Sequence, residues 1–132
     1  MALPHAQPMD VINVGPLGDE LQGTVSTSLI KTASIQLLHM VLREHQDQPQ
    51  HHVDNECVIH CLEGEVELVT GSGVHKLRAG NLIVLPAGQQ HALRARRDSA
   101  VLVTLLLDKG DAGDGGGAGN RRDLGKNTPV RP

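Results

Sequence analysis

Apolar and polar residues along the middle of the chain follow the two-residue period of β-strands. Glu65-Val66-Glu67-Leu68-Val69 alternates strictly, as a strand with one buried and one exposed face does. Residues 82–85 and 100–107 are almost entirely apolar, which is typical of strands buried on both faces. The pattern predicts strands at 57–62, 65–69, 74–77, 82–85, 91–96 and 100–107, and a short strand at 11–14.

The segment SIQLLHMVLR, residues 34–43, has an apolar density that fits either a helix or a strand. We interpret it as a strand because no helix cap precedes it and the chain downstream is strand-like. Turns containing glycine or proline separate the predicted strands at 71–73, 79–81 and 86–88. Short strands with turns at such regular spacing predict an all-β fold, either a sandwich or a closed barrel.

Composition divides the chain into three parts. Residues 1–20 should form an N-terminal arm with the first short strand, and residues 21–107 a single β-barrel domain. Residues 108–132 should form a flexible Gly-rich C-terminal tail, because they cannot bury enough apolar surface to offset the entropy of ordering them. A phosphate-binding loop is rejected there because no strand runs directly into the glycines and no Gly-Lys-Ser/Thr follows them.

Composition also removes several classes of function. The 132 residues include no Phe, Trp or Tyr, so the core must consist of aliphatic residues and the two cysteines. Proteins that bind single-stranded nucleic acid rely on aromatic stacking, and the net charge of −3 gives no electrostatic basis for binding nucleic acid. No apolar run approaches the roughly 18 residues that span a bilayer, so no membrane association is expected.

The cysteines and the N-terminus indicate a compartment. Four residues of extended strand would separate the Cα atoms of Cys57 and Cys61 by about 13 Å, which is beyond the reach of a disulfide. Reduced cysteines suit the cytosol, and the first residues lack the basic and apolar regions of a secretory signal. We therefore expect a cytoplasmic protein.

Residues 80–91 carry a motif of spaced Gly, Pro and His. Gly80, five residues, Pro86-Ala87-Gly88, two glutamines and His91 resemble the second motif of the cupin superfamily, Gly-x5-Pro-x-Gly-x2-His. The Asn that often follows four residues later is Ala95 here. Residues 51–64 resemble the first cupin motif, in which two histidines and a carboxylate precede a glycine. The resemblance covers about residues 34–107 and implies a cupin-type jelly-roll β-barrel, commonly a homodimer, with a pocket inside it.

The resemblance also implies a metal site, which this sequence matches in part. In the family register His51 and His91 hold two of the four ligand positions. Val53 replaces another histidine, and Cys57 stands where the carboxylate belongs. The stretch QHHVDNEC, residues 50–57, is therefore a shifted form of the family motif.

His52 and Glu56 lie one residue out of this register. They could face the site only through a bulge, because successive side chains of a strand point to opposite faces. An exposed loop is the alternative interpretation of QHHVDNEC. The candidate metal ligands are His51, His52 and His91, for a divalent transition metal such as Zn, Fe, Ni or Mn. Cys57 and Cys61 are candidate pocket-lining residues, with core packing as the alternative, and no organic cofactor is implied.

Two further groups have more than one interpretation. Arg94, Arg96 and Arg97 could form the polar face of a strand or meet an anionic ligand at the mouth of the barrel. His60 has the opposite parity to Cys57 along the predicted strand. It should therefore face away from Cys57, as a buried or interface histidine.

No catalytic residue can be named from the sequence, which carries no Ser-His-Asp or nucleophilic cysteine signature. The leading hypothesis is a small cytoplasmic cupin that binds a small organic molecule in its barrel, with or without a divalent metal held by histidines. The first alternative is a metal-dependent dioxygenase or related cupin enzyme. The second is a non-catalytic regulatory or structural barrel without metal. The expected partners are the small-molecule ligand and a second copy of the chain.

Overall fold

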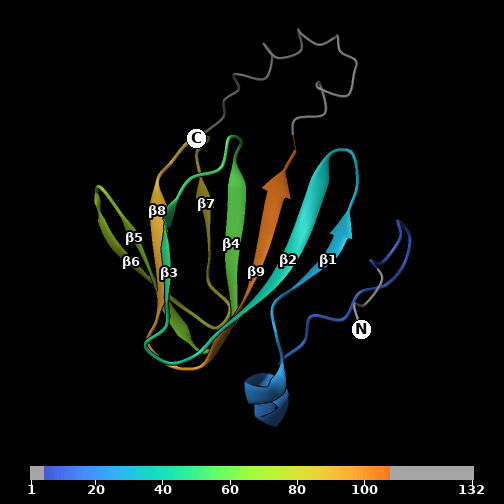
Figure 1. Ribbon diagram of the computed structural model, residues 1–132, viewed down its shortest axis with the longest axis horizontal. Helices are drawn as coiled ribbons and strands as arrows, with labels where there is room; N and C mark the ends of the chain where they lie inside the picture. The colour runs from blue at the N-terminus through green and yellow to red at the C-terminus, as the bar shows by residue number, and fades with distance from the viewer. Residues whose placement is uncertain (1–4, 108–132) are drawn as a thin grey trace, which may run out of the picture.

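The computed structural model describes residues 5–107, which form two antiparallel β-sheets facing each other (Figure 1). The five-stranded sheet has the order β1-β2-β9-β4-β7, and the four-stranded sheet the order β3-β8-β5-β6. A short 3-10 helix, η1, precedes the strands. The elements are η1 (Gly18–Gly23), β1 (Thr27–Lys31), β2 (Ile35–Leu42), β3 (Asp47–His51), β4 (Cys57–Glu63), β5 (Glu65–Thr70), β6 (Gly73–Arg78), β7 (Leu82–Leu85), β8 (His91–Ala95) and β9 (Ser99–Leu106).

Alternate side chains of both sheets point into the space between them and make the core. In β4, Cys57, Ile59 and Cys61 are buried while the residues between them are only partly buried. Val66 and Leu68 of β5 come from the opposite sheet and are fully buried. The core is aliphatic with two cysteines, as the lack of aromatic residues requires.

The all-β jelly-roll prediction is confirmed, and residues 34–43 contain the strand β2 rather than a helix. The predicted strand at 11–14 is wrong: these residues are in no strand. Apolar content alone did not make a strand there, since strand backbone groups need a partner to bond. The predicted tail at 108–132 lies outside the described residues. In the described part of the chain, no helix is long and apolar enough to cross a membrane.

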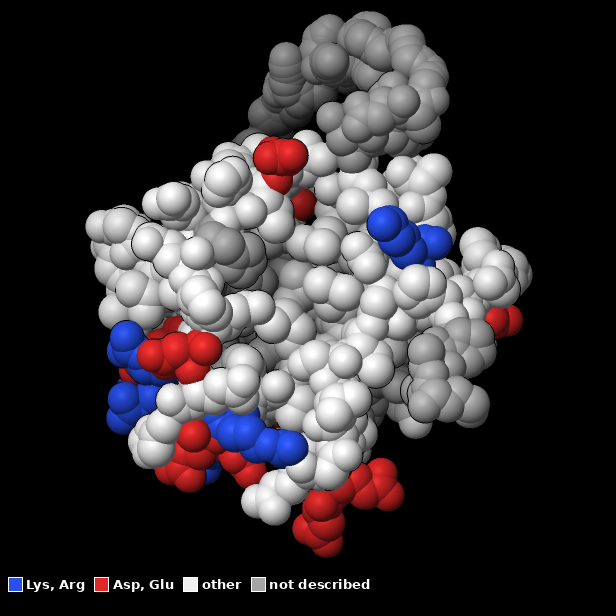
Figure 2. Space-filling model, viewed as in Figure 1, with Lys and Arg blue, Asp and Glu red and all other residues white. Residues whose placement is uncertain are grey.

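The outer face of the four-stranded sheet is charged. Glu65 of β5 pairs with Lys76 and Arg78 of β6 at 3.8 and 3.6 Å, and Glu67 pairs with Arg94 and Arg96 at 3.5 and 3.6 Å. In Figure 2 charged side chains gather along the left margin, on the side where β5, β6 and β8 lie in Figure 1, and others lie along the lower margin. This sheet therefore presents a solvated polar surface.

The N-terminal segment covers one end of the outer face of the five-stranded sheet. Leu17 and Leu21 pack with Val41 of β2 and Ala100 of β9. The carboxylate of Glu63 accepts hydrogen bonds from the backbone N–H groups of Leu17 and the residue after it, at 2.7 and 3.2 Å. The segment is thus fixed to the sheet by both apolar packing and charge-assisted hydrogen bonds.

His39 is buried on the same outer face of β2. Its neighbours along the strand, Leu38 and Met40, point into the barrel, so the imidazole points outward. It is 8% exposed, and its Nε2 atom has no hydrogen-bond partner in the described structure. Burial lowers the pKa of His39 from its ordinary 6.5, while the nearby negative charge of Glu63 opposes this shift.

We expect His39→Leu to stabilise the domain at pH 7 by about 1 kcal/mol, because it removes a buried polar atom without a partner. The gain should increase as the pH falls from 7 to 5. In the unfolded chain the imidazole of His39 binds a proton near pH 6.5, whereas in the folded chain it binds one only at a lower pH. The wild type therefore loses stability as the pH falls below about 6.5. Urea unfolding at both pH values measures this effect. The matched variant His75→Leu, at an exposed site, removes no buried polar atom and should not stabilise the domain at pH 7. Equal gains for His39→Leu at both pH values would contradict the prediction.

Candidate functional site

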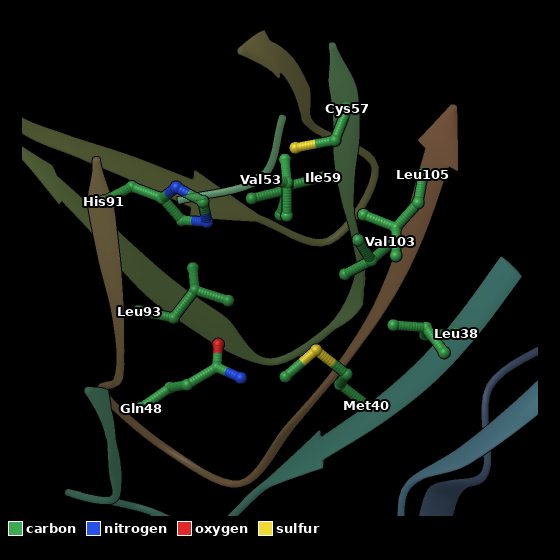
Figure 3. Close-up of a pocket in the computed structure, with 10 residues that line it drawn as sticks. All are labelled: Leu38, Met40, Gln48, Val53, Cys57, Ile59, His91, Leu93, Val103 and Leu105. Carbon is green, nitrogen blue, oxygen red and sulfur yellow. The ribbon is translucent and has the colours of Figure 1, made fainter. Parts of the chain in front are cut away.

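A cavity of about 90 Å³ lies between the two sheets (Figure 3). Both sheets and the loop after β3 contribute to its wall. Most of the lining side chains are aliphatic, and two of the others, His91 and Gln48, can form strong hydrogen bonds. The lining residues are Leu38, Met40, Gln48, Val53, Cys57, Ile59, His91, Leu93, Val103 and Leu105.

His91 is positioned by the turn that precedes β8. Gly88 adopts a left-handed φ of 78°, and its N–H donates to the carbonyl of Val53 at 2.9 Å, which ties this turn to the loop after β3. The His91 side chain is 3% exposed, and its Nδ1 lies 3.0 Å from the carbonyl oxygen of Gln89. Since a carbonyl can only accept, Nδ1 donates this hydrogen bond and carries a proton.

Cys57 and Cys61 have different surroundings although both face inward from β4. Cys57 lines the cavity, and Figure 3 shows its thiol and the His91 ring on opposite walls at one end of it. Cys61 does not appear in the lining; it is fully buried, and its thiol lies 3.6 Å from the carbonyl oxygen of Glu63. Burial raises the pKa of both thiols, that of Cys61 to about 11. Both thiols therefore stay neutral at pH 7, and both cysteines are free.

The other candidate ligands lie at the end of β3 and after it. The Cα of His51 is paired with that of His91 across β3 and β8, and the register shift in this ladder falls between Gln48 and His51. The irregularity therefore precedes His51 rather than following it. His52 is exposed and lines a separate, more open pocket with Val53, and Glu56 is exposed as well.

A catalytic zinc-type site needs three protein ligands as a rule. Among the described residues, no group of three His, Cys, Asp or Glu side chains is placed to hold a metal ion. The cavity itself contains one imidazole and one thiol, from His91 and Cys57. These two side chains alone do not complete such a site.

The arginines near His91 lie away from the cavity. Arg94 pairs with Asp47 and Glu67, and Arg96 with Glu67, on the outer face of the four-stranded sheet. Arg94 of β8 therefore lies on a polar strand face, as one interpretation predicted, whereas Arg96 and Arg97 follow the end of the strand. His60 faces outward from β4, away from Cys57, as its parity predicted.

The sequence did not reveal Gln48 or Met40 as lining residues. Gln48 lies in β3, whose polar sequence DQPQH carries no strand pattern. Met40 lies on the inward face of β2, where parity predicts burial but not which buried residues border a cavity. Figure 3 shows the two side chains near each other at the end of the cavity away from Cys57.

Comparisons with known proteins agree with this architecture. No protein of curated function matches the sequence. Among solved structures, a conserved Streptococcus pyogenes protein of unknown function is 19% identical with a TM-score of 0.63, covering 82% of this chain and 96% of its own. An RmlC-like cupin from Desulfovibrio desulfuricans is 27% identical with a TM-score of 0.59, covering 77% of this chain and 97% of its own.

A third similar structure comes from a cupin superfamily protein of Desulfitobacterium hafniense, 17% identical with a TM-score of 0.61. It covers 64% of this chain and 77% of its own. A family model described as the cupin domain matches residues 38–107, which run from the inward face of β2 to the end of β9 and include every lining residue of the cavity. The chain belongs to the cupin family.

Proposed function

We propose that this cupin binds a small, uncharged and mostly apolar organic molecule in the barrel cavity. The observation that carries the proposal is the lining: aliphatic side chains from both sheets surround a space of about 90 Å³. His91 and Gln48 supply polar atoms at different places in the wall, so they can orient a ligand that carries one polar group (Figure 3).

An anionic ligand is less favoured than a neutral one. Of the described residues that line the cavity, none is a lysine or an arginine. A carboxylate placed there would lose its hydration without a fixed positive charge to replace it. The free thiols of Cys57 and Cys61 support a reducing compartment, and we place the protein in the cytoplasm on that basis.

The test uses two probes with the same carbon skeleton. Isobutyramide should shift the methyl NMR signals of Leu38, Leu93 and Val103 with a dissociation constant in the millimolar range, since so small a ligand gains little binding energy. Isobutyrate should not. The variant Val103→Met should fill the cavity and abolish the shifts, whereas Val74→Met, on an exposed strand of the other sheet, should leave them unchanged. Equal binding of the anion and the amide would overturn the proposal.

A metal-assisted site is the second candidate. Two observations favour it: His91 and Cys57 line the same cavity, and the Cα of His51 is paired with that of His91. A metal there would be held by these residues together with the ligand or water, and it would be needed for any dioxygenase activity. Protein purified without an affinity tag, loaded with Fe²⁺, Zn²⁺, Mn²⁺ or Ni²⁺ and analysed for bound metal beside His91→Ala, distinguishes this candidate from a metal-free binding barrel.

A further inference from the structure

A second and more open pocket, of about 300 Å³, adjoins the cavity at the end of the barrel where β9 stops. We call it the outer pocket. Three of its lining residues are leucines at the end of β9 and just after it, and the other four belong to the loop between β3 and β4. They are Leu105, Leu106 and Leu107, and His52, Val53, Asp54 and Asn55.

Two residues line both the cavity and the outer pocket, namely Val53 of the loop and Leu105 of β9. Both are partly buried and pack against the hydrophobic core. Figure 3 shows the Val53 side chain on the Cys57 side of the cavity, away from Gln48. The side chains of Val53 and Leu105 therefore form a partition between the two spaces.

The backbone on both sides of the partition is fixed by hydrogen bonds. The carbonyl of Val53 accepts from the N–H of Gly88 at 2.9 Å, which ties the loop to the turn before β8. The side-chain amide of Asn55 donates to the carbonyl of Leu106 at 3.1 Å, which ties the same loop to the end of β9. The cavity is thus closed at this end by the size of two side chains rather than by a movable loop.

We infer that Val53 sets the maximum length of the ligand, so that the wild type takes only short aliphatic molecules with one neutral polar group. The inference rests on the proposed function, because it concerns a ligand whose polar group meets Gln48 and whose carbon chain points toward the partition. The isopropyl group of Val53 blocks that chain from the outer pocket. In the family register this position belongs to a histidine, whereas here an apolar side chain limits the cavity to about 90 Å³.

An aliphatic chain that passed the partition would gain apolar contacts. The leucines at the end of β9 continue the apolar lining of the cavity into the outer pocket. Each methylene group that is buried strengthens binding about fourfold. A ligand that is two methylene groups too long for the cavity should therefore bind the wild type weakly and gain affinity in a variant that lacks the partition.

The test compares isobutyramide with 4-methylpentanamide, which has two more methylene groups between the same two ends. Methyl NMR titration of the full-length wild type should give at least about 10-fold weaker binding for the longer amide. In Val53→Ala the order should reverse, with the longer amide binding about 10-fold more tightly than the shorter one. Only in the variant should the longer amide shift the methyl signals of both Leu38, in the cavity, and Leu106, in the outer pocket.

Leu105→Ala opens the partition from its other side and should change the preference in the same direction. The matched control is Val58→Ala, at a half-buried position on the outer face of β4 that lines neither space, which should keep the wild-type preference. If isobutyramide binds the wild type and both partition variants still prefer it, Val53 does not limit ligand length, and the inference is wrong while the proposed function stands. If isobutyramide does not bind the wild type, both are wrong.

Discussion

Gly64→Ala is expected to lower the free energy of unfolding by more than about 4 kcal/mol, enough to leave much of the protein unfolded. Gly64 makes the corner where the chain leaves β4 for β5, and its φ of 87° lies in the left-handed region. A Cβ added there would lie within 2.2 Å of the hydroxyl of Ser99 and 2.4 Å of the carbonyl oxygen of Asp98.

The groups that surround Gly64 cannot move easily to make room for a Cβ. Ser99 is fully buried; its hydroxyl accepts from the N–H of Glu65 at 2.9 Å and lies 2.7 Å from the carbonyl of Arg97, to which it donates. Moving this side chain would break the hydrogen bonds that join the two sheets at this corner. The overlap is therefore with a fixed part of the fold rather than with the end of a flexible side chain.

Two matched glycines separate the causes of the effect. A Cβ at Gly80 would meet open space although its φ is 94°. Gly80→Ala should therefore lower the free energy of unfolding only by the cost of a left-handed backbone, about 1–2 kcal/mol. Gly71 has open space and no left-handed φ, and Gly71→Ala should be nearly neutral. Circular dichroism and thermal unfolding of the three variants check the order. A Gly64→Ala protein as stable as Gly80→Ala would show that the corner can relax.

Sequence periodicity predicted most of the strands because each of them has one face against the core. The alternation in β5 gave its buried residues Val66 and Leu68 correctly. β3 was not predicted because its sequence is polar and includes Pro49. It is a strand because it pairs with β8. Residues 11–14 show the opposite case, in which apolar residues follow a strand pattern without any strand to pair with. The local sequence pattern therefore predicts which residues are buried, but it does not predict which segments pair as strands.

The same distinction limits prediction of the site. The family motif placed His91 and Cys57, and both line the cavity. Cys61 has the same parity as Cys57 and also faces inward, but it lies four residues further along β4. Its thiol packs against the carbonyl oxygens of Glu63 and Gly64 and does not line the cavity. Whether an inward side chain borders a cavity depends on how the two sheets are spaced, which no single strand encodes. For that reason Gln48 and Met40 could be identified only from the structure.

Leu93 is a residue whose truncation should enlarge the cavity. It lies at the centre of β8, is 1% exposed and lines the cavity, and its Cα is paired with that of Leu68 on β5. Leu68 is just as buried but does not line the cavity. The two leucines are therefore a matched pair, alike in burial and different in their relation to the proposed ligand.

Leu93→Ala is expected to cost about 3 kcal/mol of unfolding free energy, because it removes buried methyl groups and leaves space that the rigid sheets fill only partly. Leu68→Ala should cost a similar amount. Only Leu93→Ala enlarges the cavity lined by Leu38 and Val103, so benzene should raise its melting temperature and shift those methyl signals. Leu68→Ala should show neither shift at those methyls. If benzene acts on Leu93→Ala no more than on the wild type, the sheets have closed over the space, and the cavity is less rigid than its packed walls indicate.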